Sequence, residues 1–94
     1  MATWLIGHMT VHDPAKWQDY VSQVGATIAE AGAEVMFRGH LLDRVCGEAP
    51  GQLLVAIRFA DLASLRRWHE SPAYQRLIPI RKAAADVVLS AYED

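Results

Sequence analysis

The sequence predicts an α+β protein with a ferredoxin-like fold, in which two helices cover one face of a four-stranded antiparallel sheet. Two observations predict it. Four apolar segments rich in β-forming residues alternate with two amphipathic helical segments. Their order along the chain is βαββαβ, which is typical of the split βαβ arrangement. We expect residues 1–94 to form a single domain, because a chain of 94 residues has no room for a second one at about 100–200 residues per domain.

The first strand is predicted at Trp4–Val11, and the helix that follows has the clearest pattern. Asp13 is a favourable N-cap, and Pro14 suits the first helical turn because the N–H that proline lacks would have no partner there. Apolar side chains then recur at helical spacing on one arc. Gly32 is expected to end the helix just after its last turn.

The second and third strands are predicted at Val35–Val45 and Leu53–Phe59, with a Gly- and Pro-rich turn between them. In the third strand the residues at odd positions are expected to face the helices. The residues at even positions are Leu54, Ala56 and Arg58, so the other face is mostly apolar too. A sheet that is apolar on both faces needs cover on both. A second copy of the chain is the simplest cover, and we therefore expect a homodimer through the open sheet face.

The second helical segment begins after Asp61 and restarts at Ser71-Pro72, where serine is an N-cap and proline starts a helix. The restarted helix is predicted from Ala73 to about Ala85, with a kink at Pro79. The last strand is predicted at Asp86–Tyr92.

Composition excludes several classes of protein. Nine Lys and Arg side chains face eleven Asp and Glu side chains, for a formal net charge of −2, so the chain is not a nucleic-acid binder that works by bulk charge. No apolar run approaches the ~20 residues of a membrane span, and the N-terminus does not resemble a signal peptide. We therefore expect a cytoplasmic protein. Its one cysteine, Cys46, excludes an internal disulfide and a Cys-rich metal site.

Arg81 is the most informative candidate for a functional role. At helical spacing it lies on the same core-facing stripe as Tyr74. An unpaired buried charge is costly, and arginine stays protonated. Two interpretations stay open: a structural ion pair, within the chain or across a dimer, and an anchor for an anionic ligand.

His69 is the second candidate, because it stands next to the helix interruption at Ser71-Pro72. A histidine at such a break can act as a general acid or base. The alternative is a helix-end histidine that forms a hydrogen bond to a carbonyl group.

A third cluster follows from strand parity. If the strands are regular, His8, Arg38, His40 and Arg58 project from the same face of the sheet, opposite the helices. They are then either an anion-binding site or the polar rim of a dimer interface.

Aromatic side chains on both helices form the last candidate group. Trp17, Tyr20, Trp68 and Tyr74 are expected to face the sheet, where they either fill the core or line a small pocket. No metal is expected, because neither His-x-x-x-His nor Cys-x-x-Cys occurs. No cofactor is expected either: there is no Gly-rich phosphate loop, and none of the four histidines has a context that marks it as a haem ligand.

The run from Trp68 through Ser71-Pro72-Ala73-Tyr74, followed by Arg81, resembles the family called domain of unknown function 1330. The start of the first helix at Asp13-Pro14 agrees with that resemblance. It implies a dimeric α+β barrel, in a superfamily whose members include cofactor-free oxygenases, isomerases, cyclases and haem-degrading enzymes. Superfamily membership alone assigns no activity.

Three hypotheses stay open: a cofactor-free enzyme acting on a small, mostly apolar metabolite, a non-catalytic binding dimer, and a structural dimer with a filled core. In the first, His69 and Arg81 are the catalytic candidates. The substrate-binding candidates are Tyr20, Trp68, Tyr74, His8, Arg38 and His40. A cavity of a few hundred Å³ between helices and sheet would distinguish the first two hypotheses from the third.

Overall fold

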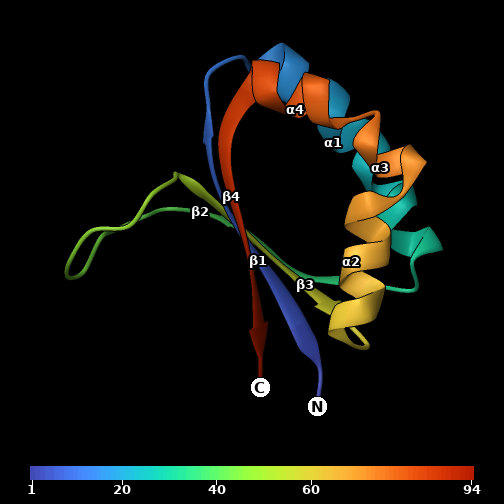
Figure 1. Cartoon of the computed structure of the whole chain (residues 1–94). Coiled ribbons are helices and arrows are strands. Elements are labelled where there is room, and N and C mark those ends of the chain that lie inside the picture. Colours follow the sequence, from blue (N-terminus) through green and yellow to red (C-terminus); the bar gives the residue numbers. More distant parts are fainter.

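The computed structural model describes residues 1–94 and has the βαββαβ order that the sequence predicts. The strands form one antiparallel sheet in the order β2-β3-β1-β4. All the helices lie on one side of this curved sheet (Figure 1). The elements are β1 (Thr3–Val11), α1 (Pro14–Glu30), β2 (Glu34–His40), β3 (Leu53–Phe59), α2 (Leu62–Glu70), α3 (Pro72–Gln75), α4 (Ile78–Ala84) and β4 (Ala85–Glu93). The predicted ferredoxin-like α+β fold is confirmed.

Helix α1 begins and ends where the sequence predicts. The Asp13 carboxylate accepts a hydrogen bond from the Lys16 backbone N–H, and Pro14 occupies the first turn. At the other end Gly32 has φ +73°, a conformation that a residue with a side chain rarely adopts. The backbone N–H of Ala33 donates to the carbonyl of Ile28, which closes the helix in a Schellman motif.

The second helical segment is more broken than predicted. The expected helix from Ala73 to about Ala85 is divided into α3 and α4. Pro79 lies in the first turn of α4 and therefore starts a new helix rather than bending a continuous one. Ser71 joins α2 to α3, because its hydroxyl donates to the Trp68 carbonyl and accepts from the Tyr74 N–H.

Strand β2 is shorter than predicted, ending at His40 rather than at Val45. Residues 41–52 form a hairpin arm that extends away from the helices (Figure 1). The arm exposes apolar side chains, including Leu42 at 89% and Val45 at 90%. A register shift between Val35 and Phe37 interrupts the pairing of β2 with β3.

The core lies between the sheet and the helices. Its ten buried residues are Leu5, Tyr20, Val24, Ile28, Ile57, Phe59, Leu65, Trp68, Tyr74 and Leu77. No helix covers the opposite face of the sheet, where Phe37 and Tyr92 are more than half exposed, at 55% and 56%. The predicted two-sided apolar sheet is therefore present. No helix is long and apolar enough to cross a membrane.

Candidate ligand-binding cavity

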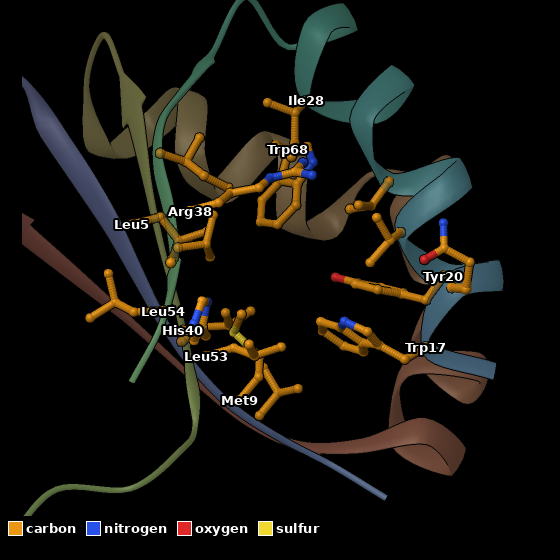
Figure 2. Close-up of a pocket in the computed structure, with 18 residues that line it drawn as sticks. Leu5, Met9, Trp17, Tyr20, Ile28, Arg38, His40, Leu53, Leu54 and Trp68 are labelled. Carbon is orange, nitrogen blue, oxygen red and sulfur yellow. The ribbon is translucent and has the colours of Figure 1, made fainter. Parts of the chain in front are cut away.

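A cavity of about 350 Å³ lies between helix α1 and the sheet. Of the 18 residues that line it, 14 are hydrophobic (Figure 2). They come from β1, α1, β2, β3, α2 and β4: Leu5, Met9, Trp17, Gln18, Tyr20, Val21, Val24, Ile28, Arg38, Gly39, His40, Leu53, Leu54, Val55, Ile57, Trp68, Val87 and Leu89. The volume falls in the usual range for small-molecule sites.

On the sheet side of the cavity, three side chains pack closely over Gly7. A Cβ atom at Gly7 would lie 2.8 Å from Val55 Cγ1, 3.1 Å from Leu89 Cδ2 and 3.2 Å from Met9 Sδ. Those three side chains come from three neighbouring strands and all line the cavity. Any larger residue at position 7 would push them toward the cavity.

The polar part of the interior is a hydrogen-bonded chain of three side chains. The Tyr20 and Tyr74 hydroxyl oxygens lie 2.9 Å apart, and Arg81 Nη1 donates to the Tyr74 hydroxyl over 2.8 Å. Because Tyr74 is completely buried and accepts from Arg81, its own O–H is best used in donation to Tyr20. The Tyr20 O–H is then free to donate to an acceptor inside the cavity, into which the ring points (Figure 2).

Burial raises the pKa of Tyr20 well above its usual value, and the neighbouring Tyr74 raises it further. The Arg81 charge acts in the opposite direction but is the smallest of these effects. Tyr20 is therefore a neutral hydrogen-bond donor at physiological pH.

Two aromatic contacts hold the cavity walls in place. Trp17 stacks on Tyr20 with ring centroids 5.1 Å apart. Trp68 packs against Tyr74 at 4.2 Å, and its indole N–H donates to the Thr27 hydroxyl over 3.0 Å. The predicted aromatic group thus faces the sheet, and three of its members, Trp17, Tyr20 and Trp68, line the cavity.

The exposed lining residues define the mouth of the cavity. They are Gln18, Arg38 and His40. Regular strand parity predicted Arg38 and His40 on the sheet face away from the helices, and that prediction is wrong. The register shift adds one residue, Met36, to β2, so that Arg38 pairs with Val55 and His40 with Leu53. Directly paired residues share a face, and Val55 and Leu53 both line the cavity.

His8 and Arg58 lie on the opposite face, as predicted. His8 pairs with Leu54, and Arg58 pairs with Trp4 and Glu34. In β3, positions 54 and 58 alternate with Leu53, Val55 and Ile57, which face the helices. The sheet therefore separates them from Arg38 and His40, and the predicted four-residue cluster does not form.

Arg81 is half-buried and forms no ion pair within the chain. Its guanidinium hydrogen-bonds to Tyr74 and lies 6.0 Å from the centre of that ring. Arg81 does not line the cavity itself. Its hydrogen bond to Tyr74 connects it to Tyr20, which does.

His69 is close to this group but does not line the cavity. Its ring centroid lies 5.5 Å from that of Tyr74. Its backbone carbonyl accepts a hydrogen bond from the Gln75 side chain, and its own side chain forms none. Its catalytic role stays a prediction.

No group of three or more His, Cys, Asp or Glu side chains gathers where it could hold a metal ion. The sequence analysis did not identify Gln18 at the mouth of the cavity, nor Gly7 in the sheet beneath Val55, Leu89 and Met9. Gly7 stands within an apolar β-forming run, and a glycine in a strand interior is itself a sign of close packing. Gln18 has no comparable signal.

The model of a family described as a domain of unknown function (DUF1330) matches residues 2–94. The chain belongs to the DUF1330 family. No curated protein sequence matches this DUF1330 protein.

Solved structures resemble it in fold. A protein of unknown function from Rhodopseudomonas palustris aligns with a TM-score of 0.84 at 14% identity, over 99% of this chain and 82% of the other. SnoaB, a cofactor-independent oxygenase from Streptomyces nogalater, aligns at 0.74 and 15% identity over 99% and 92%. A dimeric ferredoxin-like protein of unknown function from Thermobifida fusca aligns at 0.67 and 13% identity over 100% and 92%. Identities this low show a shared fold and not a shared activity.

Proposed function

We propose that this DUF1330 protein is a homodimer that binds a small, mostly apolar molecule in the cavity between α1 and the sheet. The cavity carries the proposal, because about 350 Å³ with 14 hydrophobic residues among 18 is the usual character of a small-molecule site. The cavity favours binding over a structural dimer with a filled core. The open apolar face of the sheet and the dimeric solved relative support the homodimer. A cytoplasmic location stays a prediction.

Inside the cavity, the Tyr20 O–H selects a ligand that carries a hydrogen-bond acceptor. The Tyr74 hydroxyl lies 2.9 Å from the Tyr20 hydroxyl and itself accepts a hydrogen bond from Arg81 over 2.8 Å. A flat apolar body fits between Trp17 and Trp68 on the helix side and the aliphatic side chains of the sheet.

A titration with 2-naphthol, a neutral fused-ring molecule with one oxygen, tests this proposal by isothermal calorimetry. We expect saturable binding by the native protein and its loss in Leu53→Trp, because the larger ring would fill the cavity. Leu62→Trp, at an exposed position of α2, is the matched control and should bind normally. No binding by the native protein, or equal binding by Leu53→Trp with a native circular dichroism spectrum, would contradict the proposal.

Catalysis without a cofactor is the second candidate, with oxygenation, isomerisation or cyclisation as the reaction class. The hydrogen-bonded series Arg81–Tyr74–Tyr20 favours this candidate. A hydroxyl donor connected to a positive charge stabilises the negative charge that develops on a substrate oxygen. The similarity in fold to the cofactor-independent oxygenase SnoaB is consistent with it.

The acidity of bound 2-naphthol tests this second candidate. If Tyr20 stabilises an oxyanion, ultraviolet absorbance should show a lower pKa for bound 2-naphthol than for 2-naphthol in water, and Tyr20→Phe should remove the shift. An unchanged or raised pKa of the bound ligand would count against catalysis and leave the binding role intact.

A further inference from the structure

We infer that the ligand carries an anionic group, such as a carboxylate, which Arg38 and His40 hold at the mouth of the cavity. This inference rests on the proposed function, because it names the chemical class of the ligand for the same site.

The β2 bulge is the first observation behind it. One extra residue at Met36 turns the Arg38 and His40 side chains to the cavity side of the sheet. There Arg38 pairs with Val55, and His40 pairs with Leu53. Both side chains come from β2, the edge strand, and are exposed. Figure 2 shows them on the sheet wall, across the cavity from Trp17 and Tyr20. A bulge that re-aims side chains is common next to functional sites.

The charge balance of the lining is the second observation. None of the 18 lining residues is acidic. The chain has two ion pairs, His12 with Asp86 and Lys16 with Asp13, and neither involves the mouth. The Arg38 guanidinium therefore has no carboxylate partner within the chain, although its fork of N–H donors matches one. His40 contributes an imidazole N–H in either protonation state.

The two ends of the cavity together describe a ligand with two polar groups. Tyr20 offers one neutral donor in the buried part, and at the exposed part Arg38 offers a positive charge and His40 an N–H donor. The lining between them is apolar. The matching molecule is a flat ring system with an oxygen at one end and a carboxylate at the other.

Two probes of nearly the same shape, one anionic and one neutral, test the inference: 6-hydroxy-2-naphthoate and 6-hydroxy-2-naphthamide. By calorimetry at low ionic strength we expect the native protein to bind the carboxylate about ten-fold more tightly, since hydrogen bonds to a charged group are the stronger ones. The preference should shrink as salt is added, because the mouth is exposed. The double variant Arg38→Gln/His40→Gln should bind both probes equally.

Arg66→Gln is the matched control, because it removes one charge from an exposed position of α2 and should keep the ten-fold preference. Equal binding of the two probes by the native protein would overturn the inference and leave the proposed function standing. A preference that survives in the double variant would also overturn it. Failure of both probes and of 2-naphthol to bind would instead contradict the proposed function.

Discussion

Tyr74 connects the two polar partners of the cavity, so its hydroxyl is the atom on which the hydrogen-bonded chain depends. Tyr74→Phe leaves the Tyr20 hydroxyl and the Arg81 guanidinium without the partners they have at 2.9 and 2.8 Å. We expect the free energy of unfolding to fall by about 1–3 kcal/mol, because a buried polar group that loses its partner keeps its desolvation cost. Urea denaturation measures this.

Ser22→Ala is the control for Tyr74→Phe, since it removes a hydroxyl whose hydrogen bond, to the Asp19 carbonyl, lies on the exposed surface of α1, away from the open sheet face. Its unfolding free energy should change by less than about 0.5 kcal/mol. If the two variants are equally stable, the hydrogen-bonded chain contributes nothing to stability.

The raised pKa of Tyr20 predicts a loss of stability at alkaline pH. Burial is the main cause of the shift, so the folded protein keeps the Tyr20 proton at a pH where the unfolded chain, with its ordinary pKa near 10.0, releases it. The stability is then complete below that unfolded pKa and decreases as pH rises above it. Urea midpoints measured across this range should fall less steeply for Tyr20→Phe than for the native protein. Parallel curves would argue against a buried, neutral Tyr20.

The sequence predicted the aromatic residues of the site but not their connection. Helical spacing places Trp17, Tyr20, Trp68 and Tyr74 toward the sheet, because each lies on the apolar arc of its own helix. The contact between Tyr20 and Tyr74 joins residues 54 positions apart. It depends on how α1 and α3 pack, which no local pattern encodes.

The junction between helices α2 and α3 positions Trp68 and Tyr74. Ser71→Ala removes both the hydrogen bond to the Trp68 carbonyl and the one from the Tyr74 N–H. We expect a loss of about 1 kcal/mol in unfolding free energy, which is typical of a lost N-cap. Ser71→Thr keeps the hydroxyl and should restore most of it. Equal losses in the two variants would show that the cap is not responsible.

Strand β2 shows why a regular pattern misplaced two site residues. Alternation assigns Arg38 and His40 to the face opposite the helices only if every residue of the strand pairs in turn. The extra residue at Met36 reverses the parity after Val35, and no glycine or proline between Val35 and Arg38 marks the bulge. Strands β1 and β3 pair without a shift, and for them the predicted faces are confirmed.

The overall fold could be predicted from the sequence, and the cavity could not. The βαββαβ order follows from local periodicity, and antiparallel pairing then leaves few arrangements. The volume of a cavity depends instead on small differences in packing, such as the absence of a side chain at Gly7, above which Val55, Leu89 and Met9 converge. Such differences in packing are determined only when the helices and strands come together in the folded protein.

The open sheet face predicts the state of assembly. We expect the native protein to sediment at twice its chain mass of 10.4 kDa, because a second sheet is the natural cover for apolar residues such as Phe37 and Tyr92. Ile6→Lys places a charge near the centre of that face, beside Ala56 and Ser90. It should give a folded monomer, since a charge buried at an interface without a partner is strongly unfavourable.

Leu62→Lys is the control for Ile6→Lys, because it makes the same kind of change on α2, away from the open face, and should leave the dimer intact. A native protein that sediments as a monomer at micromolar concentration would contradict the dimer, as would an Ile6→Lys variant that stays dimeric. The cavity lies on the helix side of the sheet, opposite the face that carries Ile6. The Ile6→Lys monomer should therefore still bind 2-naphthol, which separates assembly from ligand binding.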